Sequence, residues 1–148
     1  MIAASDHSAG GPTEPPKVGE KFSAQSVGPW SMDDLRRYAA ASGDDNPIHL
    51  DRELARRVGL PGPPVHGMLL MSRFVPALAV WRPDLKLIRL SSKFLRPIYV
   101  SETGELSGRV AQILTGEPTQ FLLRLMMHNE RRELSLLAEA LAIHKPGG

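Results

Sequence analysis

Gly67-Met-Leu-Leu-Met-Ser-Arg-Phe-Val-Pro-Ala-Leu-Ala-Val-Trp81 is the longest apolar run of the chain. Its apolar residues fall on nearly every side of a helix, and a helix that is apolar on every face is buried on every face. We therefore expect residues 67–81 to form one central helix. The run is shorter than the roughly 20 residues that cross a membrane, and Ser72, Arg73 and Pro76 interrupt it. The N-terminus lacks a signal-peptide pattern, so we expect a cytoplasmic protein with no membrane segment.

After Trp81 the apolar residues alternate, which is typical of strands. Residues 85–96 should place Ile88, Leu90 and Phe94 on one face and Arg89, Ser91 and Lys93 on the other. Three further strands are marked by Leu106, Val110 and Leu114, by Phe121, Leu123, Leu125 and Met127, and by residues 134–143. The short turns between these segments predict an antiparallel meander. A buried helix followed by antiparallel strands predicts an α+β fold in which the sheet wraps the helix.

The 148 residues fit one ordinary domain. Residues 1–17 are rich in Gly and Pro and should form a flexible leader, which leaves residues 18–148 as a single folded domain. In its first part we expect an edge strand over residues 22–27 and a helix that is capped by Ser31 and ends near Ala41. A short helix over residues 52–58 should follow.

Composition excludes several functions. The chain has no cysteine, so disulfides, thiolate zinc sites and cysteine nucleophiles are excluded. The net charge of +2 is small, and basic residues alternate with acidic ones along the chain, so we do not expect a nucleic-acid surface.

Two short segments before the apolar run carry the residues with chemistry, Ser42-Gly-Asp-Asp-Asn-Pro-Ile-His-Leu-Asp51 and Val65-His-Gly67. Pro47 has no N–H and Asn46 favours turns, so the first segment should be a stiff loop. Within it, Asp44 and His49 could share a water molecule. Gly67 begins a helix and offers a free N–H to a carbonyl oxygen. These groups are the ones needed to add water across an activated double bond, so the residues predict a hydratase.

Each of these residues also has a structural interpretation. A carboxylate in such a loop is commonly a turn or cap residue, and a single histidine is commonly a structural hydrogen-bonding group. A metal site made of Asp44, Asp45, His49 and Asp51 would be poorly spaced for one helix face or a known loop cage. We therefore expect no metal ligands.

Gly43-Asp44-x-Asn46-Pro47-x-His49-x-Asp51, followed by His66-Gly67-Met68 at the head of an apolar helix, resembles the MaoC-like hydratase family, which includes the (R)-specific enoyl-CoA hydratases. The resemblance covers about Val18 to the C-terminus. It implies the hot-dog fold, a dimer with a continuous sheet, and no cofactor. It also implies that Asp44 and His49 are catalytic and that the Gly67 amide polarises a thioester carbonyl. Asn46 and His66 belong to the same motif, and we expect them to bind substrate.

One position departs from the family pattern. Some (R)-specific hydratases carry a serine nine residues after the histidine of the His-Gly pair, where this chain has Val75, and Ser72 lies almost one turn earlier. The substrate preference of those enzymes is therefore not carried over. Because Asp44 and His49 are both present, we expect a catalytic chain and not an inactive partner.

These observations predict a lyase that interconverts trans-2-enoyl and (R)-3-hydroxyacyl thioesters of coenzyme A or acyl carrier protein, as a homodimer or as part of a heterodimer. Two alternatives are a hot-dog thioesterase, against which the loop motif argues, and a non-catalytic subunit that supplies only an acyl tunnel. If the basic face of the predicted strand 85–96 meets the tunnel mouth, Lys93 and Arg96 would bind the carrier's phosphates. If it does not, they only solvate the strand.

Overall fold

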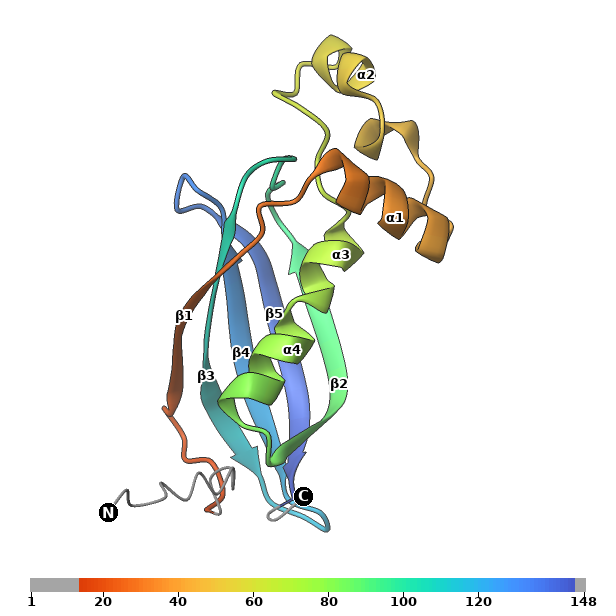
Figure 1. Ribbon diagram of the computed structural model, residues 1–148. Helices are drawn as coiled ribbons and strands as arrows, with labels where there is room; N and C mark the ends of the chain where they lie inside the picture. The colour runs from red at the N-terminus through yellow and green to blue at the C-terminus, as the bar shows by residue number, and fades with distance from the viewer. Residues whose placement is uncertain (1–13, 146–148) are drawn as a thin grey trace, which may run out of the picture.

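The computed structural model describes residues 14–145 (Figure 1). Its elements in chain order are β1 (Lys21–Val27), α1 (Met32–Ser42), the 3-10 helix η1 (Pro47–His49), α2 (Arg52–Arg57), α3 (Gly67–Ser72), α4 (Phe74–Trp81), β2 (Leu85–Phe94), β3 (Gly104–Leu114), β4 (Gln120–His128) and β5 (Leu134–His144). The sheet lies behind α3 and α4 and curves around them in Figure 1, so the predicted α+β plan is confirmed.

The strands lie in the order β1-β3-β4-β5-β2, and each is antiparallel to its neighbours. β3, β4 and β5 form the predicted meander, but β2 pairs with β5 and not with β3, so the prediction of one meander through all four strands is wrong. After β2 the chain does not turn back sharply. It pairs with the segment before α3, where Val65 N–H donates to Ile98 O (2.8 Å) and Val100 N–H donates to Pro63 O (2.9 Å). This pairing leads the chain from β2, at one edge of the sheet, to β3, which lies next to β1 at the other edge.

β2 contains a bulge at Ile88, where its register with β5 shifts between Leu87 and Arg89. A bulge adds one residue and so reverses the alternation of side chains along a strand. Leu87 and Leu90 remain partly buried, whereas Ile88 is 51% exposed. The prediction that Ile88 and Leu90 share a face is therefore wrong.

The predicted single helix over residues 67–81 is divided at Arg73 into α3 and α4. The cause is Pro76, which has no N–H to donate to Ser72 O and whose ring crowds that carbonyl. Phe74 and Leu78 pack into the core, but Val75 and Val80 are 46% and 79% exposed. The expectation of a helix buried on every face is wrong for the single chain, because the sheet covers only one side of the helix.

Most of the core comes from the inward-facing residues of the sheet. All four residues predicted to share a face on β4 are buried: Phe121, Leu123, Leu125 and Met127. Leu106 and Val110 on β3 are fully buried as well, and they pack in the same cluster as Phe74 of α4. The predicted face is confirmed for β4 and for Leu106 and Val110 on β3. The prediction that Leu114 shares that face is wrong, because the register of β3 with β4 shifts between Val110 and Gln112 and Leu114 then pairs with Gln120 on the opposite face.

α1 begins and ends where the sequence predicts, within one residue. Asp34 N–H donates to Ser31 Oγ (3.1 Å), and Ser31 N–H donates to the Asp34 carboxylate (2.8 Å), which makes a capping box. The helix stops at Gly43, whose φ of 79° is in the left-handed region that glycine adopts at low cost. α1, η1 and α2 all lie at one end of the molecule, with α1 beside α3 and α2 farther out (Figure 1).

A buried arginine directly after α4, Arg82, connects the segment before β1 to the segment before β2. Arg82 donates to both oxygens of Asp84 (2.8 and 2.6 Å) and to Glu20 (2.9 Å), and all but 3% of its side chain is buried. It also donates to Glu14 O (2.7 Å), so the described part of the predicted leader contacts the domain. Residues 1–13 of that leader lie outside the described residues. From residue 14 to residue 145, every helix is too short or too polar to cross a membrane.

Candidate active site

The loop after α1 is held by its own side chains. Asn46 Oδ1 accepts the N–H of Ile48 (3.1 Å) and caps η1, whose first residue is Pro47. Asp51 accepts two N–H groups from the first turn of α2 (2.9 and 3.1 Å). These two caps fix the backbone on both sides of His49. They also occupy the oxygen of Asn46, the side chain that the sequence assigned to substrate binding.

His49 lies half-buried at the end of η1 with one ring nitrogen occupied. Its Nδ1 is 2.7 Å from Pro64 O. A carbonyl oxygen can only accept a hydrogen bond, so this distance places the ring proton on Nδ1 and leaves the lone pair on Nε2. An imidazole fixed in this form is a base with one defined accepting atom.

His66 lies directly behind His49. The two rings stack with centroids 4.0 Å apart and planes inclined by 25°, and Tyr38 packs against His66 at 4.7 Å. His66 Nε2 is 3.1 Å from Asp44 O, and its side chain is buried. Burial and the neighbouring His49 lower the pKa of His66 below its ordinary value of 6.5, so its ring is neutral at neutral pH.

These contacts bring the two predicted catalytic residues together. One carboxylate oxygen of Asp44 and one ring nitrogen each of His49 and His66 lie within 4.8 Å of one another. The side chain of Asp44 is exposed, and its Oδ1 is 3.5 Å from the N–H of Asn46. A water molecule can therefore reach the Asp44 carboxylate and the imidazole of His49 from solvent. Asp45, the neighbouring acid, is outside this cluster.

The same three residues are the ones that could hold a metal ion. Histidine and carboxylate are ordinary zinc ligands. However, the ligands of a tetrahedral ion point at it from different directions, whereas the rings of His49 and His66 are stacked nearly parallel. The geometry suits an acid-base pair better than a metal centre.

Gly67 is the first residue of α3, so its N–H has no acceptor inside the helix. It faces an apolar cavity of about 250 Å³ whose lining includes Phe94, Arg96 and Leu136. α3 has only six residues before the break at Arg73, so the contribution of the helix dipole is smaller than for the predicted long helix. The N–H itself is the group that this site offers to an oxygen atom.

The two cations assigned to phosphate binding lie on different sides of the sheet. Arg96 lines the cavity beside Gly67. Lys93 lines a separate hollow with Arg124 and Glu139, on the face of the sheet that points away from the helices. Of the two, only Arg96 is placed where it could meet a molecule bound at Gly67.

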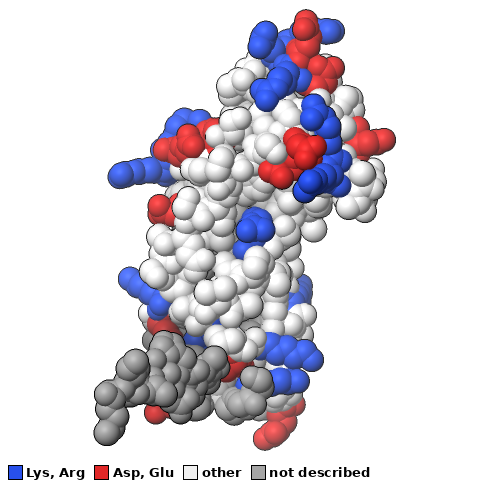
Figure 2. Space-filling model, in the orientation of Figure 1, with Lys and Arg blue, Asp and Glu red and all other residues white. Residues whose placement is uncertain are grey.

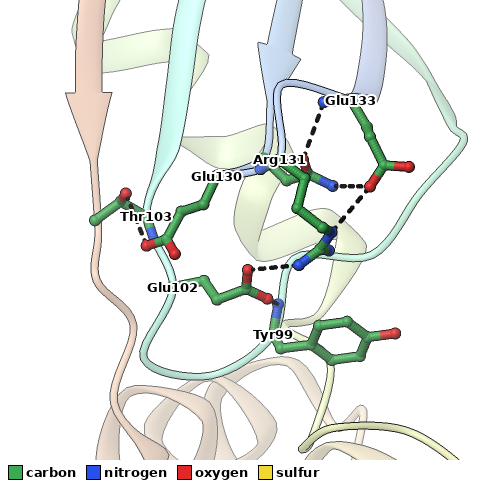
Figure 3. Close-up of polar contacts among 7 residues, drawn as sticks. Tyr99, Glu102, Thr103, Glu130, Arg131 and Glu133 are labelled. Atoms are coloured by element: carbon green, nitrogen blue, oxygen red, sulfur yellow. Dashed lines mark hydrogen bonds and ion pairs between the residues drawn. The ribbon is translucent and has the colours of Figure 1, made fainter.

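Figure 3 shows the contacts of Glu133, which forms an ion pair with Arg96. Arg131 donates to Glu133 (3.0 Å) and to Glu102 (3.1 Å), and its guanidinium lies 6.0 Å from the centre of the Tyr99 ring. Arg96 pairs with the second oxygen of Glu133 at 3.0 Å. This network attaches the turn between β4 and β5 to the connection that follows β2, and its Arg96 also lines the cavity.

Sequence reasoning missed Tyr38, Phe94 and this network. Tyr38 lies on α1, for which the sequence predicted no part in the site, and Phe94 was predicted only to share a strand face with Ile88 and Leu90. Their contacts with His66 and Gly67 join segments that are far apart in the chain. The only sequence feature that could have pointed to Phe94 is its position as an aromatic residue at the end of a strand, and this feature is too common to indicate a site.

A family match covers most of the chain: the model described as MaoC like domain matches residues 14–117. The chain belongs to the MaoC-like domain family. This MaoC-like chain is 35% identical over 101 residues to the mitochondrial 3-hydroxyacyl-[acyl-carrier-protein] dehydratase of Arabidopsis thaliana. The match covers 68% of this chain and 58% of that relative, so the chain spans less than two thirds of its length.

Solved structures agree on the fold. The (R)-hydratase of A. caviae, described as involved in PHA biosynthesis, superposes with a TM-score of 0.77 at 26% identity, over 86% of this MaoC-like chain and 96% of that one. The ChsH1-ChsH2 complex of Mycobacterium tuberculosis gives a TM-score of 0.74 at 17% identity, over 87% and 98% of the two chains, which shows the fold alone. The chain has the hot-dog fold, as the resemblance implied.

Proposed function

We propose that this chain hydrates trans-2-enoyl thioesters to (R)-3-hydroxyacyl thioesters and catalyses the reverse dehydration. The observation that carries the proposal is the hydrogen bond between His49 Nδ1 and Pro64 O (2.7 Å). It leaves Nε2 as the accepting nitrogen of a ring that lies in one cluster with the Asp44 carboxylate. A base and a carboxylate that can hold one water between them are what hydration requires.

In the forward reaction, a water oxygen bonds to the β-carbon and the electron pair of the double bond moves to the α-carbon. Asp44 and His49 hold the water and take one of its protons, and a proton from the same pair is delivered to the α-carbon. The pair ends with the same number of protons with which it began. Dehydration follows the same path in reverse, because both directions share one transition state.

As water adds, negative charge develops on the thioester oxygen. We propose that the Gly67 N–H donates to that oxygen, and the proposal is supported by the lack of an acceptor for this N–H inside α3. The absence of a side chain at Gly67 lets the thioester approach the backbone closely. Hydration of the double bond and stabilisation of the enolate thus involve residues from both sequence motifs.

The thioester's carrier is proposed as coenzyme A or acyl carrier protein. The relatives support both: one is named an acyl-carrier-protein dehydratase, and the other an (R)-specific enoyl-CoA hydratase, 38% identical over 71 residues, 47% of this chain and 53% of that protein. Arg96 at the cavity is the cation that would meet a carrier phosphate. We further propose a cytoplasmic enzyme that needs no cofactor.

Incubation with crotonyl-CoA and analysis of the products test the proposal. Formation of 3-hydroxybutyryl-CoA is the expected result. Release of free CoA would instead identify a thioesterase, and absence of any reaction would identify a non-catalytic subunit. Chiral analysis of the product tests the (R) configuration separately.

We also propose that the chain works as a dimer, with a homodimer expected. Figure 2 shows that charged side chains gather at the two ends of the molecule, while the surface over α3 and α4 is mostly uncharged. There Met68, Val75 and Val80 are 56%, 46% and 79% exposed, and a second chain would cover them. Light scattering at micromolar concentration should give twice the chain mass. A monomer would contradict the proposal, and a requirement for a second, different chain would identify a heterodimer.

A further inference from the structure

His66 connects the three groups of the proposed site, although it does not face solvent. It is 1% exposed, and its ring lies between those of Tyr38 and His49. A side chain covered in this way cannot touch a substrate without movement of its neighbours. The role in substrate binding that the sequence suggested for His66 therefore has no contact to support it, and its burial calls for another explanation.

The hydrogen bond of His66 fixes its proton. Nε2 lies 3.1 Å from Asp44 O, which can only accept, so Nε2 carries the proton. Nδ1 is then a buried lone pair, and it has no hydrogen-bond partner among the described residues. The neighbouring His49 has the opposite form, with its proton on Nδ1 facing Pro64 O. Two stacked imidazoles thus carry their protons on opposite nitrogens, each fixed by a backbone carbonyl.

These contacts act on both members of the acid-base pair. The Nε2–H of His66 donates a hydrogen bond to the backbone carbonyl of Asp44. The ring of His66 stacks on the ring of His49 and so fixes its orientation. The residue that follows it is Gly67, whose N–H is proposed to hold the substrate oxygen. A catalytic group that is misplaced by about 1 Å can lose about 10²-fold in rate, so a residue that fixes such groups has a large effect without touching the substrate.

We propose that His66 is a positioning residue that sets the distance between the Asp44 carboxylate, His49 Nε2 and the Gly67 amide. This proposal rests on the proposed hydratase function. It assigns the effect to one hydrogen bond, from His66 Nε2–H to Asp44 O, and to one ring contact, with His49. Each can be removed separately.

Steady-state kinetics with crotonyl-CoA test the hydrogen bond. His66→Phe keeps a ring between Tyr38 and His49 but removes the N–H donor, so kcat should fall by about 10- to 10²-fold. KM should stay within about twofold, because no substrate contact is lost. The amide N–H of His66→Gln can reach the same carbonyl. Its log kcat should therefore recover at least about a third of the decrease seen in His66→Phe. His128→Phe, the same change at a half-buried histidine on β4, should leave both constants unchanged.

A turnover for His66→Phe within twofold of wild type would overturn the proposal, and so would a His66→Gln variant no better than His66→Phe. If a variant fails to fold, NMR of the wild-type imidazole nitrogens still tests the arrangement. His49 should carry its proton on Nδ1 and His66 on Nε2. A His66 protonated on Nδ1 at pH 8 would overturn the proposal without any measurement of activity.

The two proposals fail in different ways. A wild-type chain that does not hydrate crotonyl-CoA contradicts the proposed function, while the NMR measurement still reports where the protons of His49 and His66 lie. A wild-type chain that hydrates crotonyl-CoA, together with a fully active His66→Phe variant, contradicts only the role of His66.

Discussion

The ring of Phe94, the last residue of β2, lies against the backbone of Gly67 at the start of α3. A β-carbon placed on Gly67 would be 2.8 Å from two atoms of that ring, and the three nearest atoms around it all belong to Phe94. Glycine is therefore favoured here for two reasons: the ring occupies the space of a side chain, and the proposed substrate oxygen must reach the N–H.

The effects of Gly67→Ala on stability and on activity should distinguish the two reasons. Phe94 is 51% exposed and its ring can turn away, so the free energy of unfolding should fall by only about 1 kcal/mol. We expect kcat/KM for crotonyl-CoA to fall more than about tenfold, because the methyl group blocks the approach to the amide. Adding Phe94→Ala should restore stability without restoring activity. Near-normal kcat/KM in Gly67→Ala would remove Gly67 from the mechanism.

The acid-base pair gives the most direct prediction. Asp44→Asn and His49→Ala should each lower kcat by about two to four orders of magnitude, the usual contribution of a positioned acid or base. Asp45→Asn is the matched control, since Asp45 is an exposed acid one residue away and outside the cluster. It should keep most of the activity. If Asp45 proved essential and Asp44 did not, the assignment of the loop would be wrong by one residue.

Arg96 and Lys93 should differ in their effect on substrate binding. Arg96 lies at the cavity beside Gly67 and Lys93 lies on the far face of the sheet. Arg96→Ala should raise KM for an acyl-CoA by about two- to tenfold with kcat unchanged, because a phosphate is bound alike in the ground and transition states. The increase should shrink as salt is added. Lys93→Ala should change neither constant, and an equal increase in both variants would contradict this assignment.

The pairing of Arg82 with Asp84 should matter for stability and not for catalysis. Both side chains are buried, and the hydrogen bond from Arg82 lowers the pKa of Asp84. Asp84→Ala leaves a buried guanidinium without this partner and should cost about 3–5 kcal/mol of unfolding free energy, measured in urea. Asp33→Ala breaks an exposed pair with Arg37, where both side chains are more than 60% exposed, and should cost less than about 0.5 kcal/mol. If Asp84→Ala and Asp33→Ala lowered the free energy of unfolding equally, the buried pair would be no more stabilising than the exposed one.

The lowered pKa of His66 predicts a pH dependence of stability. In the unfolded chain His66 takes up a proton near pH 6.5, but in the folded protein burial and His49 oppose this uptake. The unfolded state then binds more protons, so the free energy of unfolding falls as the pH is lowered through about 6.5. Urea unfolding at pH 7.5 and pH 5.5 should show this loss. His66→Gln should reduce it, and an unchanged pH dependence in that variant would contradict the prediction.

Local chemistry explains why some elements were predictable. α1 starts at a capping box between Ser31 and Asp34 and stops at Gly43, and all the groups involved are neighbours in the chain. The alternation on β4, and on β3 as far as Val110, was also readable, because these stretches have one buried face and the register of β3 with β4 is regular up to Val110. The loop from Asp44 to His49 was recognised for the same reason: its caps and its proline act over a few residues.

The errors arose from one local breaker whose effect was underestimated and from pairing between distant segments. Pro76 divides the apolar run into α3 and α4, and the bulge at Ile88 reverses a pattern that looks regular in the sequence. The partner of β2 was wrong because hydrogen bonds between residues 63–65 and 98–100 redirect the chain, and alternation along one strand does not reveal its partner.

The sequence by itself determined the kind of fold and the family, and it singled out Asp44 and His49 as the proposed acid-base pair, because helix caps, turn residues and a short motif act through neighbouring groups. Tertiary structure decided how those residues are used. Which nitrogen of His49 carries its proton depends on Pro64 O, the neutrality of His66 depends on its burial beside His49, and access to Gly67 depends on Phe94. Each of these is set by the distance between groups that are far apart in the chain, and such distances exist only once the sheet has closed around the helices.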